Sequence, residues 1–388
     1  MKTVCIVTST RADYGILRPL IARLLRFPSI DLRIVATGMH LCPEYGNTYM
    51  DISKDGFDIH KKIEIQLSAD TNAAMSKSMG MALICFADYF CEFTPDLLIL
   101  LGDRYEIMAI SCAAANQRIP IAHLYGGETT EGAVDDYYRH AITKMSSLHF
   151  TSCEVYRRRV IQLGEHPESV HNVGSLGVEN IKKTELLTLK ELSEDLGFAL
   201  EYRKYCVVTF HPTTLERDAT RQFEELTSAM REFPQMRFII TGANSDAEGR
   251  AINDLWKKHI SSCDNCLFVI SLGMIRYLSS LKYCAAIVGN SSSGIIEGPA
   301  FNIPTVDIGD RQKGRISTDS ILHCEPICNS IVSAMSKAFD PTFQNFCKTV
   351  INPYGDGNTS ERIINILSDR LAAGISQRKK FYDIKFKE

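Results

Sequence analysis

The sequence lacks long hydrophobic runs, and no apolar stretch in it approaches the ~18 residues that a membrane-spanning helix requires. It also lacks an excess of charge of one sign, since 43 Lys and Arg side chains face 46 Asp and Glu side chains and leave a net charge of −3. Nucleic acids and membrane surfaces favour proteins with a basic patch or stripe. We therefore expect a soluble protein with no nucleic-acid partner and no membrane partner.

The thirteen cysteines lack the pattern of a disulfide framework, because they are odd in number and scattered through apolar segments. This usage is typical of small core residues in a reducing compartment. The apolar run 4–7 is too short for the core of a signal peptide, so we expect a cytoplasmic protein. Cys263 and Cys266 form a C-x-x-C pair, but no second pair follows at zinc-finger spacing. Since this ligand set is incomplete, we expect no metal there.

Two nucleotide-binding signatures are also absent. No G-x-G-x-x-G follows the first expected strand, which argues against a nicotinamide or flavin cofactor on that turn. The Lys-Ser/Thr pair of a P-loop is missing, which argues against a nucleoside triphosphatase. Instead, Arg11 stands at the start of the first expected helix, where a cation opposes the helix dipole unless an anion lies nearby. We therefore take Arg11 as a candidate ligand-binding residue.

What the chain has is a regular alternation of short β-branched runs with amphipathic segments, the pattern of parallel sheets covered by helices. At 388 residues we expect two domains, because single cores stop growing before this length. The expected strands of the first half are 3–8, 32–37, 97–101, 119–124, 148–152 and 170–173. Those of the second half are 206–210, 237–241, 267–271, 286–289 and 305–308. The charged segment 182–204 is interpreted as a linker with one helix, so the boundary falls near 175–200.

Polar and charged groups follow most of these strands. Open α/β sheets bind ligands beyond the carboxyl ends of their strands. Two doubly wound, Rossmann-like halves would turn these ends toward a shared cleft, and we expect the functional groups to gather there.

The stretch 289–293 has the features of a phosphate-binding loop between a strand and a helix. Its small residues let the backbone approach an anion, and the first N–H groups of the helix would point at that anion. Ser291 and Ser292 add hydroxyl donors, and Glu297, about one helical turn in, is placed to accept from ribose hydroxyls. A plain Ser/Gly turn is the alternative interpretation of this loop alone.

A second strand end nearby favours the anion-binding interpretation. The run 303–308 predicts a buried strand, and the turn after it carries Arg311, Lys313 and Arg315. Two successive strand ends therefore offer groups suited to a diphosphate.

Three carboxylates in the first half are candidate catalytic groups. Asp103 directly follows the apolar strand 97–101, where an acid is costly unless it is paired or used, although Arg104 or Arg139 could simply pair with it. Glu128 follows two glycines, which suggests tight backbone beside a ligand. Asp136 lies at a helix start, where acids are also ordinary caps.

Histidines are the other candidates. His211 ends a strand and precedes a proline, so it could shuttle a proton when neutral or bind a phosphate when charged. A lone histidine is more often structural. His40 is a weaker candidate of the same kind, and His123, inside an expected strand, is predicted to be a core residue.

Taken together, nine motifs resemble the UDP-N-acetylglucosamine 2-epimerase family, in consistent order from about residue 3 to about residue 370. The motifs are Thr10-Arg11-Ala12-Asp13-Tyr14, Gly38-Met39-His40, Tyr45-Gly46-Asn47-Thr48, Gly102-Asp103-Arg104, Gly126-Gly127-Glu128, Asp136 with Arg139-His140, His211-Pro212, Gly289-Asn290-Ser291-Ser292 and Gly309-Asp310-Arg311-Gln312. The sequence looks closest to the hydrolysing branch that supplies N-acetylmannosamine for bacterial sialic acid synthesis.

The resemblance implies a glycosyltransferase-B-like fold with an N-terminal domain at 1–178, a UDP-binding domain at 179–365 and a segment 366–388 that returns to the first domain. It also implies a homodimer or homotetramer, a nucleotide sugar as ligand, no metal and no dissociable redox cofactor. By the same resemblance, UDP would be held by Arg11, His211, Asn244, Ser291, Ser292, Glu297 and Arg311. The sugar would be surrounded by Asp103, Glu128, Asp136 and His211. His40, Arg104 and Arg139 complete the expected substrate-binding set.

The implied reaction removes the C2 proton and the anomeric UDP together in an anti elimination, and water then adds to the resulting 2-acetamidoglucal with C2 inverted. A carboxylate would take the proton while cations and helix N-termini stabilise the departing diphosphate. Two departures from the family pattern leave the identity of the sugar substrate open. Tyr125 stands where some relatives carry an acid, and Ala133-Val134 replaces their Thr-Ile. The alternatives are the same reaction on a UDP- or GDP-linked 2,4-diacetamido-6-deoxy sugar for legionaminic acid, a glycosyltransferase of the same architecture, and a non-catalytic nucleotide-sugar sensor.

Overall fold

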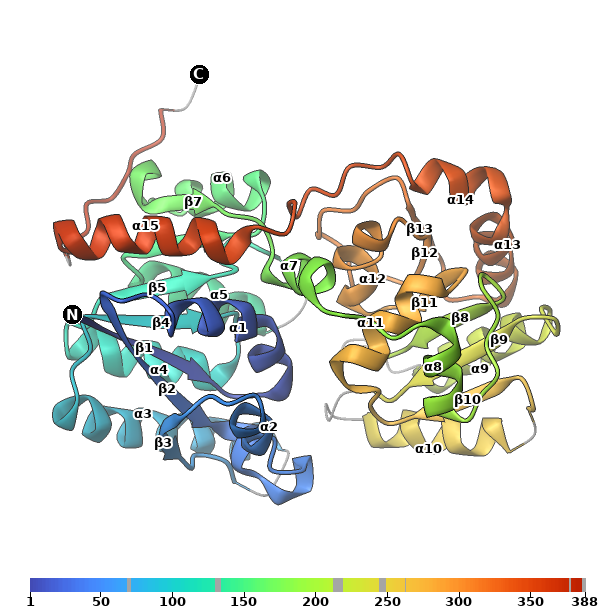
Figure 1. Ribbon diagram of the computed structural model, residues 1–388, viewed down its shortest axis with the longest axis horizontal. Helices are drawn as coiled ribbons and strands as arrows, with labels where there is room; N and C mark the ends of the chain where they lie inside the picture. The colour runs from blue at the N-terminus through green and yellow to red at the C-terminus, as the bar shows by residue number, and fades with distance from the viewer. Residues whose placement is uncertain are drawn as a thin grey trace. The chain divides into compact units, whose positions relative to one another are not determined.

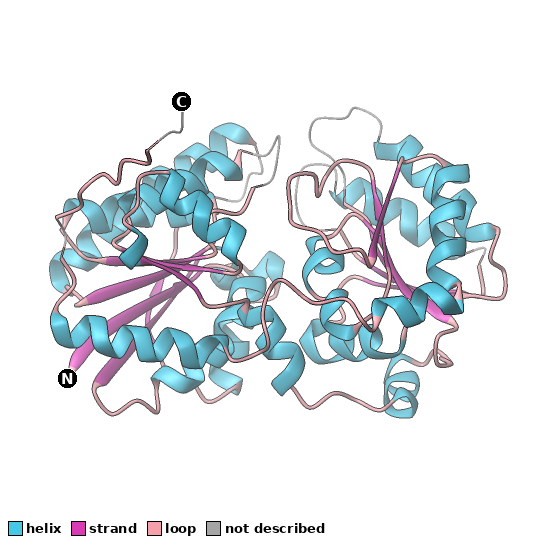
Figure 2. Cartoon of the chain, turned by 90° about the horizontal axis from the view of Figure 1, so that it is seen from above, coloured by secondary structure: helices cyan, strands magenta, loops and turns pink. Residues whose placement is uncertain are grey.

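The computed structural model describes residues 1–67, 71–129, 134–211, 219–243, 249–261, 263–376 and 378–385. The chain forms two compact units, which are described separately below. Unit 1 contains the chain up to Asn180 and again from Tyr354 onward, and unit 2 is built on Ile181–Pro353. Each unit has one parallel sheet flanked by helices on both sides (Figure 2).

Unit 1 has a seven-stranded sheet in the order β3-β2-β1-β4-β5-β6-β7 (Figure 1). Its strands are β1 (Lys2–Thr8), β2 (Ile30–Thr37), β3 (Ile59–Ile63), β4 (Leu97–Leu101), β5 (Ile121–Leu124), β6 (Leu148–Thr151) and β7 (Val170–Asn172). Its helices are α1 (Arg11–Leu24), α2 (Tyr49–Lys54), α3 (Asn72–Glu92), α4 (Tyr105–Asn116), α5 (Asp135–Met145), α6 (Glu154–Gln162), α7 (Leu176–Lys183, which crosses into unit 2) and α15 (Thr359–Ala373). The strand order reverses between β1 and β4, the kind of position where open α/β sheets bind ligands.

Unit 2 has a six-stranded sheet in the order β10-β9-β8-β11-β12-β13, with the reversal between β8 and β11. Its strands are β8 (Tyr205–Thr209), β9 (Arg237–Thr241), β10 (Cys266–Val269), β11 (Ala286–Gly289), β12 (Thr305–Ile308) and β13 (Ile321–Cys324). Its helices are α8 (Leu189–Leu196), α9 (Ala219–Arg231), α10 (Gly249–Ile260), α11 (Gly273–Tyr283), α12 (Ser292–Ile296), α13 (Cys328–Phe339) and α14 (Pro341–Cys347).

Both sheets have an apolar core on each face, because their strands are apolar on both sides. In β4, for example, Leu97, Ile99 and Leu101 pack toward α1 and α15, while Leu98 and Leu100 pack toward α3 and α4. Two-sided burial is what a continuous apolar run predicts for a parallel sheet. The two-domain α/β fold expected from the sequence is therefore confirmed.

All eleven expected strands are present, with ends shifted by at most a few residues. Two strands were not predicted, β3 and β13, and each lies at an edge of its sheet with a single neighbour. The three residues between Ile59 and Ile63 are polar and exposed, so β3 carries no apolar run. The expected helix of the linker 182–204 is α8, which begins with a capping box between Thr188 and Glu191.

The C-terminal part of the chain belongs to unit 1, and α15 packs against α1 (Figure 1). The sequence placed this return at residue 366, whereas the contacts place it already at Tyr354. Ser360, at the start of α15, donates from both N and Oγ to the buried carboxylate of Glu179 on α7, at 2.6 and 2.5 Å. These bonds fix the start of the returning helix. None of the helices in the described parts of the chain is long and apolar enough to cross a membrane.

Candidate active site

In unit 1, the candidate carboxylates follow adjacent strands at the carboxyl end of the sheet. β4 ends at Leu101, and the next residue, Gly102, has a φ of 79°, a left-handed conformation that favours glycine. This turn carries Asp103 out of the strand direction before α4 begins. His123 on β5 is fully buried and bonds the Gly102 carbonyl through Nε2 at 2.8 Å, which confirms it as a core residue that supports the turn.

Arg139 is the residue that organises the acidic groups. Its side chain is only 3% exposed, and it donates from Nη2 to Asp103 and from Nη1 to Asp136, the latter at 3.0 Å. Burial lowers the pKa of Arg139, but the charges of Asp103 and Glu128 outweigh it and raise the pKa overall. The structure therefore brings Asp103, Asp136 and Arg139 together, with Glu128 close enough to act on the guanidinium. Charge compensation of this kind allows carboxylates to sit in a partly buried site.

Glu128 is 5% exposed and accepts a hydrogen bond from Ser152 Oγ at 2.9 Å. Of the two glycines before it, Gly127 is sterically required, and Gly126 would bring a side chain into close contact with its neighbours. A Cβ on Gly127, whose φ is 82°, would lie 2.4 Å from the Tyr156 carbonyl oxygen, and a Cβ on Gly126 would lie 3.0 Å from Thr143 Oγ1. The glycine pair thus lets the loop after β5 press against the helices and hold Glu128 in place.

The loop after β1 has its own buried network. Thr10 caps α1 by accepting from Asp13 N at 3.1 Å, and Ser9 Oγ donates to Asp13 at 2.8 Å. Burial raises the pKa of Asp13, and the charge of Arg104 opposes that shift. Arg104 also donates from Nε to the buried Glu106 at 2.6 Å. Arg11, at the first position of α1, is exposed.

His40 is fully buried, and both of its ring nitrogens contact threonine hydroxyls. Nε2 lies 3.0 Å from Thr8 Oγ1 and Nδ1 lies 2.8 Å from Thr48 Oγ1. Burial lowers the pKa of His40 to about 4, so the ring is neutral at neutral pH. This geometry connects the end of β1 with the segment before α2, and it makes His40 a residue that positions these loops. Substrate binding by His40 stays a prediction.

In unit 2, Asn290 ties three strand ends together. Its Oδ1 accepts from His211 N at 2.7 Å, and its Nδ2 donates to His211 O at 2.8 Å. Its carbonyl oxygen accepts from Arg311 Nη1 at 3.0 Å and from Gln312 Nε2 at 2.8 Å. Asn290 follows β11, His211 lies two residues beyond the end of the neighbouring β8, and the other two follow β12, so this set is built at the reversal of the strand order. The hydrogen bond to the carbonyl oxygen of Asn290 thereby holds the Arg311 cation next to the loop 289–293.

His211 is 5% exposed. Burial, assisted by the charge of Arg311, lowers the pKa of His211 to about 3. Of the two roles that the sequence left open, a neutral imidazole that exchanges a proton or donates a hydrogen bond fits this environment better than a charged phosphate ligand.

The loop 289–293 has the tight backbone expected of an anion cradle. Gly289 has a φ of 133°, and a Cβ there would lie 2.0 Å from the Thr209 carbonyl oxygen on β8. Ser291 is the N-cap of α12, and its side chain accepts from Ser293 N at 3.4 Å. Ser291 and Ser292 are both partly exposed. The first turn of α12 therefore presents its N–H groups beside two hydroxyls.

Glu297 ends α12, and its Oε2 atom is buried without a hydrogen-bond partner among the described residues. Burial raises the pKa of Glu297 to about 7, although a hydrogen bond from Ser293 opposes this shift. A buried carboxylate oxygen that lacks a donor is suited to accept from ligand hydroxyls. The assignment of Glu297 to the ribose hydroxyls stays a prediction.

Asn244, the remaining predicted ligand-binding residue, lies outside the described residues. Sequence reasoning did not assign roles to Asn290, Gln312, Asp13 or Ser152, which organise the two sets of side chains. Asn290 and Gln312 stood inside recognised motifs, but their contacts join strand ends that are distant along the chain, and no local pattern reveals such contacts.

The fold is that of a two-unit α/β protein of the glycosyltransferase-B-like kind, with a tight loop before a short helix in one unit and a set of carboxylates in the other. A family profile described as UDP-N-acetylglucosamine 2-epimerase matches residues 22–368. The chain belongs to this family.

Two curated relatives and one solved structure show how broad the similarity is. A polysialic acid biosynthesis protein of Escherichia coli is 39% identical over 386 residues, 99% of this chain and 98% of its own length. A GDP/UDP-N,N'-diacetylbacillosamine 2-epimerase (hydrolyzing) of Campylobacter jejuni is 39% identical over 345 residues, 88% of this chain and 89% of its own length. The structure of the UDP-GlcNAc 2-epimerase of Neisseria meningitidis bound to UDP-GlcNAc matches with a TM-score of 0.80 at 17% identity, covering 95% of this chain and 100% of that one.

Proposed function

We propose that the protein is a hydrolysing UDP-N-acetylglucosamine 2-epimerase, which converts UDP-N-acetylglucosamine and water into N-acetylmannosamine and UDP and so feeds sialic acid synthesis. The observation that carries this proposal is the buried Arg139 holding Asp103 and Asp136 beside Glu128. Such a set offers a carboxylate base together with a fixed cation. The Escherichia coli relative, similar over nearly the whole chain, supports the product assignment.

In this proposal, one of the three carboxylates takes the proton from C2 of the sugar while the bond from C1 to the UDP oxygen breaks. The electron pair of the C2–H bond forms the C1–C2 double bond, and UDP leaves with the electron pair of the C1–O bond. Water then adds across the double bond. Its hydroxyl joins C1, and a proton joins C2 on the face opposite to the one from which the first proton was removed, so that C2 is inverted. The balance is one nucleotide sugar and one water consumed, and one free sugar and one UDP released.

Unit 2 supplies the groups that bind and stabilise UDP. Arg311 and the first turn of α12 carry positive charge or N–H donors, and negative charge develops on the diphosphate as it leaves. The neutral His211 would donate to a phosphate oxygen or return a proton. Glu297 would accept from the ribose hydroxyls.

A second candidate substrate is a UDP- or GDP-linked 2,4-diacetamido-6-deoxy sugar. The Campylobacter jejuni relative favours it, because that protein is as similar in identity as the Escherichia coli one. The chemistry at C1 and C2 would be the same. A homodimer or homotetramer and a cytoplasmic location also remain proposals, and light scattering after size-exclusion chromatography tests the first of them.

Incubation of the pure protein with each nucleotide sugar, without any acceptor, tests the function. We expect UDP and free N-acetylmannosamine from UDP-N-acetylglucosamine. Release of a free sugar only from UDP-N,N'-diacetylbacillosamine would establish the second candidate. Turnover that appears only after a sugar acceptor is added would identify a glycosyltransferase instead.

The UDP-binding role of the β12 turn gives a first prediction. Replacing Arg311 by Ala should weaken UDP binding by about 1–3 kcal/mol, the scale of charge-assisted hydrogen bonds to a phosphate. The matched control is Lys313→Ala, a cation of the same turn whose side chain is 63% exposed, and it should change affinity little. Calorimetric titration with UDP measures both variants, and equal affinity of the Arg311 variant and the wild type would disprove the assignment.

A pH dependence follows from Glu297. Because its pKa is raised to about 7, the side chain is protonated below that pH and becomes a stronger acceptor above it. If ribose hydroxyls donate to this carboxylate, the UDP affinity of the wild type relative to Glu297→Gln should rise by about 3- to 10-fold from about pH 6 to about pH 8. Titration of UDP itself affects both proteins equally and cancels in the ratio. A ratio that stays constant over this range would remove Glu297 from the ribose site.

A further inference from the structure

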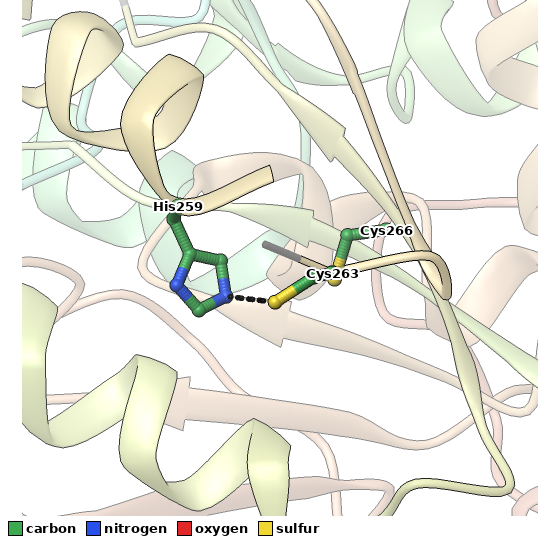
Figure 3. Close-up of side chains that lie close together, drawn as sticks. All are labelled: His259, Cys263 and Cys266. Carbon is green, nitrogen blue, oxygen red and sulfur yellow. Dashed lines mark hydrogen bonds between the residues drawn. The ribbon is translucent and has the colours of Figure 1, made fainter. Parts of the chain in front are cut away.

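A second group of metal-ligating side chains lies in unit 2. His259 is in the last turn of α10, Cys263 is in the turn that follows, and Cys266 is the first residue of β10. Across the described parts of the chain, this is the one group whose His, Cys, Asp or Glu ligand atoms all lie within 4.8 Å of one another. Figure 3 shows the imidazole directed at the sulfur atom of Cys263, with Cys266 next to it.

The distances suit a tetrahedral zinc ion. His259 Nε2 and Cys263 Sγ are 3.6 Å apart. Zinc bonds of about 2.3 Å to sulfur and about 2.05 Å to nitrogen, at the tetrahedral angle, separate the two ligand atoms by about 3.6 Å. The same zinc–sulfur bond length separates two sulfur ligands by about 3.8 Å, and the ligand atoms of all three residues lie within 4.8 Å of one another.

The ring of His259 is held in place by its neighbours. It is 9% exposed, and it packs edge-on against Trp256 and Phe223 with centroid separations of 5.8 and 6.4 Å. Its Nε2 atom lies 3.6 Å from the sulfur atom of Cys263, in the turn after the helix. The imidazole is therefore preorganised toward the two sulfur atoms.

The turn that carries the cysteines is fixed as well. Asn265, between them, donates from Nδ2 to Met236 O at 2.9 Å, and its own carbonyl oxygen accepts from Phe238 N at 2.9 Å. Cys266 N donates to Cys263 O at 3.4 Å, which closes the turn. A ligand set on a fixed turn and a fixed helix end loses little entropy on binding a metal.

We propose that His259, Cys263 and Cys266 bind a zinc ion that fastens α10 to the edge strand β10, with a water molecule in the fourth position. The site is distinct from the candidate active site. Cys266 begins β10, whereas His211 and Asn290 follow the carboxyl ends of strands parallel to it, at the opposite end of the sheet. Because the two sets of residues lie at opposite ends of the sheet, we expect the ion to act on the stability of unit 2 and not on the chemistry at the sugar.

Cobalt(II) substitution tests the geometry directly. Wild-type protein, stripped with a chelator under reducing conditions and titrated with CoCl2, should show sulfur-to-cobalt charge-transfer absorption and the intense visible bands of tetrahedral cobalt. ZnCl2 should displace these bands, and MgCl2 should not, because magnesium prefers oxygen ligands. Zinc should also raise the unfolding temperature of the stripped protein.

Variants of the proposed ligands test whether the cobalt absorption bands and the zinc binding arise from these three residues. Cys263→Ser and His259→Gln should each weaken zinc binding by at least about 10-fold and abolish the cobalt bands. The control is Cys91→Ser, which removes an exposed cysteine on α3 of unit 1 and should leave both signals unchanged. Zinc binding that is absent in the wild type, or equal in the wild type and the Cys263 variant, would overturn the proposal. So would a Cys263–Cys266 disulfide that persists in the reduced, zinc-supplied protein.

Discussion

Replacing Asp103, Glu128 or Asp136 by its amide is expected to lower turnover by about 10²-fold or more, with little change in UDP affinity. The amide keeps the shape of the side chain and can accept a hydrogen bond, but it cannot take a proton from C2. Arg139 acts on all three acids, so the loss should be largest for the acid that serves as base and smaller for those that orient it. Rates of UDP release and calorimetric UDP affinities, measured on the same preparations, separate catalysis from binding.

The adjacent acid Asp135 supplies a matched control. It is exposed and stands next to Asp136 at the start of α5, so Asp135→Asn makes the same chemical change at the same helix end. We expect near-normal turnover for this control. If all three amide variants of the site remained folded and kept normal turnover as well, the carboxylates would have no role as a base.

Removing the cation that holds these acids should have the second large effect. Arg139→Met leaves Asp103 and Asp136 without their shared partner, and breaking such a pair typically costs about 3–5 kcal/mol when it is buried. The two carboxylates are 25% and 23% exposed, so water compensates in part, and we expect a loss of about 2–4 kcal/mol in the free energy of unfolding. Urea denaturation of the whole protein, wild type and variant, measures this loss.

Two further variants show whether the loss comes from the unpaired charges. Arg158→Met removes an arginine on α6 whose side chain is 77% exposed, and it should cost less than about 1 kcal/mol. Adding Asp103→Asn and Asp136→Asn to Arg139→Met should restore part of the stability without restoring turnover. If the triple variant were no more stable than Arg139→Met, the charge pairing would not be the cause.

The strands were predictable wherever a strand is buried on both faces, because its sequence is then a continuous apolar run, as in Leu97–Leu101. Two strands were not predictable because they carry no continuous buried run: β3 exposes its central lysines, and β13 has one buried residue followed by partly or fully exposed ones. The return of the chain at Tyr354 was placed too late for a related reason. The contact between Ser360 and Glu179 joins residues far apart in sequence, and no local pattern marks it.

The candidate site was predictable as a set of strand ends but not as a network. The three-residue spacing of Asp136 and Arg139 indicates a helical pair, while the pairing of Arg139 with Asp103 depends on the order of β4 and β5 in the sheet. For the proposed zinc site, the C-x-x-C spacing of Cys263 and Cys266 marks two possible ligands, and the third, His259, stands four residues before Cys263. No cysteine pattern marks that histidine, so the sequence alone predicts no metal there.

The fate of hydrogen at C2 tests the central claim, elimination followed by hydration, most directly. The protein is incubated with UDP-N-acetylglucosamine in D2O, and the products are identified by NMR. Because the elimination discards the original C2 proton and the hydration takes a new one from solvent, free N-acetylmannosamine should carry deuterium at C2 and appear together with UDP. N-acetylmannosamine that retains protium at C2 would contradict the account.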